Sequence, residues 1–134
     1  MILVDTSVWI DYFAGKKSKT TDLLNESVEN SDDICTCGLI ITEILQGIRV
    51  DKEFERVKSI LSGLIYLPIT KNMFIYASTL YRTIRKNGKT IRSPIDCIIV
   101  SLCLEHEVNL LYNDKDFDII SQYTSLRSVK KTDQ

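Results

Sequence analysis

Residues 93–120 read SPIDCIIVSLCLEHEVNLLYNDKDFDII and contain the features that decide the fold. The segment begins with Ser93 and Pro94, a capping residue followed by proline, which is typical of a helix start. Asp96 is the only charged residue from there to Leu104, and a short aliphatic strand follows. A carboxylate in a protein interior must be paired, hydrogen-bonded or bound to a metal. Asp96 therefore predicts partners elsewhere in the chain.

The overall composition is that of an ordinary globular chain. Its 134 residues suit a single domain, 1–134, with 44% hydrophobic and 26% charged residues. A net charge of −1 argues against a general polyanion binder, although a local basic patch can still contact nucleic acid. No apolar run approaches the roughly 20 residues that cross a bilayer. The opening MILVD lacks the basic region of a signal peptide, so no membrane partner is expected.

The cysteines point to a reducing compartment. Cys35, Cys37, Cys97 and Cys103 lie in apolar surroundings and lack C-x-x-C spacing. Such residues are typically reduced, buried thiols. We therefore expect a cytoplasmic protein.

Short aliphatic strands alternate with helices along the chain. The expected strands cover 1–5, 32–37, 65–69 and 108–113, with a candidate fifth strand at 126–129. The expected helices cover 8–13, 20–30, 38–48, 51–63, 71–88, 94–106 and 114–123. Thr6 or Ser7 is expected to cap the first of them. This alternation predicts an α/β fold with a mostly parallel sheet covered on both faces.

Acidic residues recur where the predicted strands end. Asp5 follows the first strand, and Asp114 and Asp116 follow the fourth. Asp96 lies in the first turn of the helix that leads into that fourth strand. Glu43 lies on the edge of the apolar stripe of the helix after the second strand. Active sites of such sheets gather outside the carboxyl ends of the strands, so these acids are expected to converge.

Converging carboxylates indicate a metal site. They repel one another and stay ionised together only with a cation, and oxygen-only ligands suit Mg²⁺ or Mn²⁺ rather than zinc. A carboxylate-held pair of such ions commonly hydrolyses phosphodiesters: one lowers the pKa of the attacking water, and the other stabilises the leaving oxygen. Each acid alone could instead be a helix cap, a dipole partner or a solvated surface residue. Their joint position favours the metal site.

Three segments also resemble a known family: ILVDTSVWIDYF at 2–13, TEILQGI at 42–48, and 93–120. Together, in this order and spacing, they are similar to the PIN-domain ribonucleases, and specifically to the VapC toxins of bacterial toxin–antitoxin pairs. The resemblance implies an α/β/α sandwich with a mostly parallel sheet of four or five strands. It implies a Mg²⁺- or Mn²⁺-dependent endoribonuclease active on cellular RNA. It further implies a homodimer that is inhibited by a cognate antitoxin lying over the catalytic groove.

The resemblance assigns roles to residues by position. Asp5, Asp96 and Asp114 would hold the metal, and Glu43 would bind a second metal or position the water. Asp116 occupies a place that is also acidic in many relatives, so it competes with Asp114 as the fourth acid. Hydroxide would attack the phosphorus in line and leave a 5′-phosphate and a 3′-hydroxyl. The side chains expected to orient the carboxylates or a bound water are Thr6, Ser7 and Asn113.

A basic segment precedes Asp96. Residues 82–92 carry no acid, and their cations could position RNA through its phosphates or could simply be a solvated helix end. The residues are Arg82, Arg85, Lys86, Lys89 and Arg92, of which the last is expected to come nearest the groove. His106 is the only histidine, which argues against a histidine-dependent ribonuclease.

Two other functions remain open from the sequence. A non-catalytic PIN-like module would bind RNA or a protein partner without cleaving RNA. The same metal chemistry could also cleave DNA, because nothing in the sequence indicates recognition of the 2′-hydroxyl.

Overall fold

The computed structural model describes residues 1–129 of the chain, which form four strands and seven helices. The strands are β1 (Ile2–Val4), β2 (Ile34–Thr36), β3 (Ile65–Tyr66) and β4 (Asn109–Leu111). The helices are α1 (Thr6–Phe13), α2 (Lys19–Glu29), α3 (Gly38–Leu45), α4 (Asp51–Ser62), α5 (Lys71–Lys86), α6 (Pro94–His106) and α7 (Asp116–Ser121). This is the alternation that the aliphatic pattern predicts.

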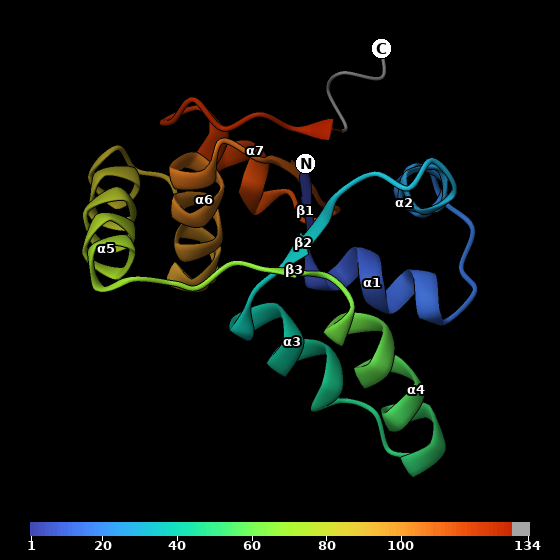
Figure 1. Ribbon diagram of the computed structural model, residues 1–134. Coiled ribbons are helices and arrows are strands. Elements are labelled where there is room, and N and C mark those ends of the chain that lie inside the picture. Colours follow the sequence, from blue (N-terminus) through green and yellow to red (C-terminus); the bar gives the residue numbers. More distant parts are fainter. Residues whose placement is uncertain (130–134) are drawn as a thin grey trace.

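The four strands within residues 1–129 form one parallel sheet in the order β3-β2-β1-β4. In the central strand β1, Leu3 pairs with Cys35 of β2 on one side and with Leu110 of β4 on the other. Figure 1 shows α5 and α6 on one side of the strands and α1 and α2 on the other. The predicted α/β/α sandwich is therefore confirmed, with a sheet of four strands in the described residues.

The hydrophobic core is built around the sheet. Leu3, Val4, Leu110 and Leu111 are fully buried because helices cover both faces, which explains why the strands are continuously aliphatic rather than alternating. On α1, the buried Trp9 stacks on a neighbouring phenylalanine ring with centroids 5.4 Å apart. The core thus fixes β1 and β4, the two strands that precede the predicted acids.

Several expected ends of elements differ in the structure. The candidate strand at 126–129 is reduced to a single bridge between Leu110 and Ser128. At the start of α1, the capping position is occupied by Asp5 rather than by Thr6 or Ser7. The backbone of Asp5 is still extended, with φ −69° and ψ 158°, so the two hydroxyl residues already lie in the first helical turn.

Helix α5 ends at Lys86, two residues before the end at 88 that the sequence predicts. Gly88 adopts φ +77°, a left-handed conformation that favours glycine. The N–H of Lys89 donates to the carbonyl of Ile84 at 3.2 Å, and the N–H of Gly88 donates to that of Arg85 at 3.0 Å. This pair of bonds is a Schellman motif, which terminates the helix and turns the chain toward α6.

The start of α6 is fixed by a local cap. The Ser93 hydroxyl accepts a hydrogen bond from the N–H of Ile95 at 3.1 Å, and Pro94 occupies the first helical position. The cap determines where the first turn lies, and that turn carries Asp96.

We expect Ser93→Ala to lower the free energy of unfolding by about 1 kcal/mol, because an orphan N–H of the first turn loses its acceptor. Ser93→Thr keeps the hydroxyl and should stay close to wild type. Urea unfolding in EDTA measures both variants. Equal stability of all three proteins would show that the cap contributes nothing.

The structure also shows whether any helix could cross a membrane and in what state the cysteines are. Among the described residues, no helix combines the length and the apolar character that a membrane crossing requires. All four cysteines are buried free thiols. Burial raises the pKa of Cys97 to about 12, so this thiol stays protonated and unreactive at neutral pH.

Candidate active site

The carboxyl ends of β1 and β4 bring distant residues to the same edge of the sheet. The backbone N–H of Asp5 donates to the carbonyl of Leu111 at 2.9 Å, so the residue after β1 lies directly beside the end of β4. Asp114 follows three residues beyond Leu111. The pairing of two neighbouring parallel strands thus explains why acids more than a hundred residues apart belong to one site.

Asp96, Asp114 and Asp116 come together although they lie on α6, in the loop after β4 and on α7. One carboxylate oxygen of each lies within 4.8 Å of the others. The backbone N–H of Asp116 also donates to the Asp114 carboxylate at 2.9 Å, which fixes the turn between them. A group of oxygen donors without nitrogen or sulfur matches the preference of Mg²⁺ and Mn²⁺.

The environment of Asp96 opposes its negative charge. Its pKa is raised to about 7. Burial is the main cause, and the negative charges of Asp5, Asp114, Asp116 and Glu43 are the smaller ones. Within residues 1–129, the Asp96 carboxylate makes no hydrogen bond or ion pair, and the capping of α6 is performed by the serine before it. At neutral pH a proton or a cation is needed to neutralise this group.

Asp5 and Glu43 lie close enough for their charges to act on Asp96. The pKa of Asp5 is raised to about 6, chiefly by burial and to a smaller extent by the charges of Glu43 and Asp114. The Thr6 hydroxyl donates to the Glu43 carboxylate at 2.9 Å, which joins α1 to α3. The Ser7 hydroxyl donates to the Asp5 carboxylate at 3.5 Å. Two of the side chains predicted to orient acids therefore do contact acids.

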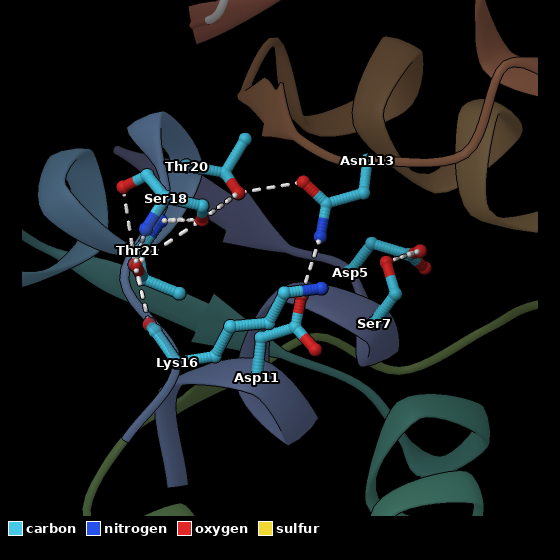
Figure 2. A network of polar contacts seen from close by, with 8 residues as sticks. All are labelled: Asp5, Ser7, Asp11, Lys16, Ser18, Thr20, Thr21 and Asn113. Carbon is cyan, nitrogen blue, oxygen red and sulfur yellow. Dashed lines mark hydrogen bonds and ion pairs between the residues drawn. The ribbon is translucent and has the colours of Figure 1, made fainter. Parts of the chain in front are cut away.

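Asn113 makes its contacts away from the five acids. Figure 2 shows its side chain between α2 and α1: its oxygen accepts from the Thr20 hydroxyl at 2.6 Å, and its nitrogen donates to Asp11 at 3.3 Å. Lys16 lies 3.8 Å from the same aspartate. This network ties down the loop after β4 and thereby positions the next residue, Asp114.

Asp11 and Thr20 are not predicted from the sequence. Their partner Asn113 is 102 and 93 residues away, respectively, and neither residue belongs to a spacing pattern that indicates the contact. A polar residue within the otherwise apolar VWIDYF of α1 was the only available signal for Asp11.

The basic segment divides into one residue that reaches the acids and four that do not. Arg92 forms an ion pair with Asp114, and its Nε lies 3.4 Å from the Asp116 carboxylate. Its backbone N–H also donates to Asp116 at 2.9 Å. The other predicted cations are exposed to solvent: Arg82, Arg85, Lys86 and Lys89.

Comparison with known proteins identifies a family. Residues 2–122 match the family described as PIN domain. The chain is 33% identical over 130 residues to VapC ribonuclease Mb1587 of Mycobacterium bovis and to Ribonuclease VapC11 of Mycobacterium tuberculosis, covering 96% of this chain and 97% of each relative. Ribonuclease VapC19 of M. tuberculosis is 24% identical over 111 residues, covering 83% of this chain and 86% of the relative.

Solved structures show the same fold. VapBC2 from Rickettsia felis, bound to a DNA fragment from its promoter, matches with a TM-score of 0.73 at 15% identity, over 96% of this chain and 97% of that chain. VapC20 of M. tuberculosis, a toxin that cleaves the sarcin-ricin loop, matches with a TM-score of 0.63 at 13% identity, over 88% and 93% of the two chains.

Proposed function

Because this chain belongs to the PIN-domain family, among the VapC ribonucleases, we propose that it is a metal-dependent endoribonuclease. It hydrolyses phosphodiester bonds in cellular RNA as the toxin of a toxin–antitoxin pair. The observation that carries the proposal is the half-buried Asp96 carboxylate, which has no hydrogen-bond partner in residues 1–129 and is repelled by four other acids. Such an arrangement is costly without a cation and is characteristic of functional sites.

The residues present fit Mg²⁺ or Mn²⁺. Asp96 and Asp114 are the core of the site, because they belong both to the predicted ligand set and to the group of closely spaced oxygens. Asp116 completes that group, and Asp5 acts on it from the end of β1. A bound divalent cation supplies the Lewis acidity that activates water and offsets the charge of the phosphodiester.

The protein's own groups then orient and deprotonate the attacking water. Glu43, held by the Thr6 hydroxyl at 2.9 Å, accepts a proton from the water. The water oxygen bonds to phosphorus as the bond from phosphorus to the 3′ oxygen breaks, and the 3′ oxygen takes a proton from solvent water. The products are a 5′-phosphate and a 3′-hydroxyl.

RNA is held by cations at the edge of the site. Arg92 lies against Asp114 and Asp116, so its guanidinium is within reach of a phosphate that enters the acidic site. Four further cations lie exposed before it along the chain and contact phosphates without reading sequence. They are Arg82, Arg85, Lys86 and Lys89.

The proposal includes two protein partners, a second copy of this chain and an antitoxin. We propose a cytoplasmic homodimer inhibited by an antitoxin. The antitoxin is supported by the matching solved structures, which include a toxin–antitoxin complex from Klebsiella pneumoniae and the VapBC2 complex. Exposed apolar side chains available for protein contacts include three consecutive residues of α5, Phe74, Ile75 and Tyr76.

The direct test is incubation of antitoxin-free protein with total cellular RNA and with single-stranded DNA, in Mn²⁺, in Mg²⁺ or in EDTA. We expect discrete RNA fragments with 5′-phosphate ends in either metal and intact RNA in EDTA. RNA that is bound in Mn²⁺ without being shortened would identify a non-catalytic module. Cleavage of the DNA alone would identify a deoxyribonuclease.

We expect Thr6→Val to reduce the cleavage rate about tenfold, because Glu43 loses the hydrogen bond that orients it. Thr6→Ser keeps the hydroxyl and should cleave at a rate near that of wild type. Initial rates at saturating Mn²⁺ compare the three proteins. A Thr6→Val variant as fast as wild type would mean that the orientation of Glu43 does not limit the reaction.

A further inference from the structure

Arg92 bridges two of the three closely spaced acids. Its guanidinium forms an ion pair with Asp114, and its Nε lies 3.4 Å from Asp116. The backbone N–H of Arg92 donates to the Asp116 carboxylate at 2.9 Å as well. Both carboxylates supply oxygens to the group that spans less than 4.8 Å with Asp96. The arginine therefore places its positive charge where a metal ion would bind.

We propose that Arg92 is a resident counter-cation, which occupies the acidic site of the metal-free protein and gives up its carboxylate contacts when a divalent metal binds. The inference rests on the proposed function, because it takes Asp114 and Asp116 as part of the metal site. An arginine keeps its charge at every accessible pH, so it can clear the site only by moving. Two cations against the same carboxylate oxygens repel strongly in a partly buried site.

The exposures of the three side chains show which of them can move. The Arg92 side chain is 76% exposed, whereas the side chains of Asp114 and Asp116 are 23% and 13% exposed. An exposed ion pair is weak and its long side chain has many alternative rotamers in solvent. The acids therefore stay in place while the guanidinium swings out.

A purely positioning arginine would have the opposite effect on metal affinity. If Arg92 only held the two carboxylates in a geometry suited to the metal, its removal would weaken metal binding. If it competes with the metal, its removal strengthens binding. The sign of the change therefore separates the two roles without any measurement of RNA cleavage.

The experiment is calorimetric titration of Mn²⁺ into metal-free wild type, Arg92→Gln, Arg92→Lys and Arg56→Gln. We expect Arg92→Gln to bind Mn²⁺ about fivefold more tightly than wild type, as the loss of a competing exposed ion pair implies. Arg92→Lys keeps the charge but loses the two-pronged guanidinium, so its Mn²⁺ affinity should lie between those of wild type and Arg92→Gln. Arg56 also pairs with a carboxylate, Glu53 on α4, and its variant makes the same charge change without altering Mn²⁺ affinity.

The outcomes separate this inference from the proposed function. The proposed role of Arg92 as a counter-cation is overturned if Arg92→Gln has a cooperative melting transition but binds Mn²⁺ no more tightly than wild type. Equal tightening of Mn²⁺ binding by Arg56→Gln overturns it too, because the effect would then be net charge alone. Should wild type cleave RNA in Mn²⁺ while Arg92→Gln binds no better, only the counter-cation fails. Should no variant bind Mn²⁺, both proposals fail.

Discussion

Replacing Asp96 with asparagine should reduce RNA cleavage by at least about a hundredfold while leaving the fold intact. The substitution keeps the shape of the side chain but removes the anionic oxygen at the centre of the acidic site, and a metal-dependent step depends on several kcal/mol of such stabilisation. Because the carboxylate is half-buried and repelled by its neighbours, the neutral amide should also make the metal-free protein more stable at neutral pH. Cleavage rates in Mn²⁺ and thermal unfolding in EDTA measure the two effects.

Asp51→Asn is the matched control for this substitution. Asp51 lies in the first turn of α4 and is exposed, and Figure 1 shows α4 apart from α6 and α7, so Asp51 shares the helix-dipole role of Asp96 but not the site. We expect it to cleave RNA at the wild-type rate and to be slightly less stable. Full activity in Asp96→Asn, or equal behaviour of the two variants, would leave Asp96 as an ordinary first-turn acid.

Metal-free protein should become more stable as the pH falls from 8 to 5. The folded protein binds protons at Asp96 and Asp5 with pKa values of about 7 and about 6, whereas the ordinary value is 3.8. Between about pH 4 and 8 the folded state therefore holds more protons than the unfolded state, and its stability falls as the pH rises through this window. Above about pH 8 both groups are ionised in either state and the loss is complete. After allowance for solvent screening, we expect a change of about 2 kcal/mol.

Urea unfolding in EDTA across this pH range provides the measurement. Asp96→Asn should flatten the dependence, because it removes the group with the larger pKa shift. Saturating Mn²⁺ should stabilise wild type most at high pH, where the ligands are ionised. If the free energy of unfolding in EDTA stayed constant or increased from pH 5 to 8, burial and mutual repulsion would not raise the pKa values of these acids in the folded protein.

The sequence predicted most of the fold because its signals are local. Helix caps and strand runs depend on residues a few positions apart, such as Ser93 with Pro94 before α6 and the aliphatic run at 109–111. The placement of acids after strands also follows from local order, since parallel strands put their carboxyl ends at one edge. The order of strands and acids was therefore enough to identify Asp5, Asp96, Asp114 and Asp116 as candidates for one site.

Element boundaries were predicted less well. The helix expected to continue to residue 88 ends at Lys86, because the left-handed Gly88 closes it with a Schellman motif. The candidate strand at 126–129 forms only one bridge to β4. In both cases a competing local geometry or the limit of sheet pairing, rather than hydrophobic pattern, determines the end of the element.

By itself, the sequence determined the order of strands and helices, the apolar core and the acids available to one site. Only the tertiary structure decided how those acids are held and neutralised. Arg92 reaches Asp114 across 22 residues, and Asn113 reaches Asp11 across 102. Contacts of this kind depend on which strands are neighbours and on which way each side chain points. Neither is encoded in the local spacing of hydrophobic residues, because the same hydrophobic pattern is compatible with several strand orders and rotamers.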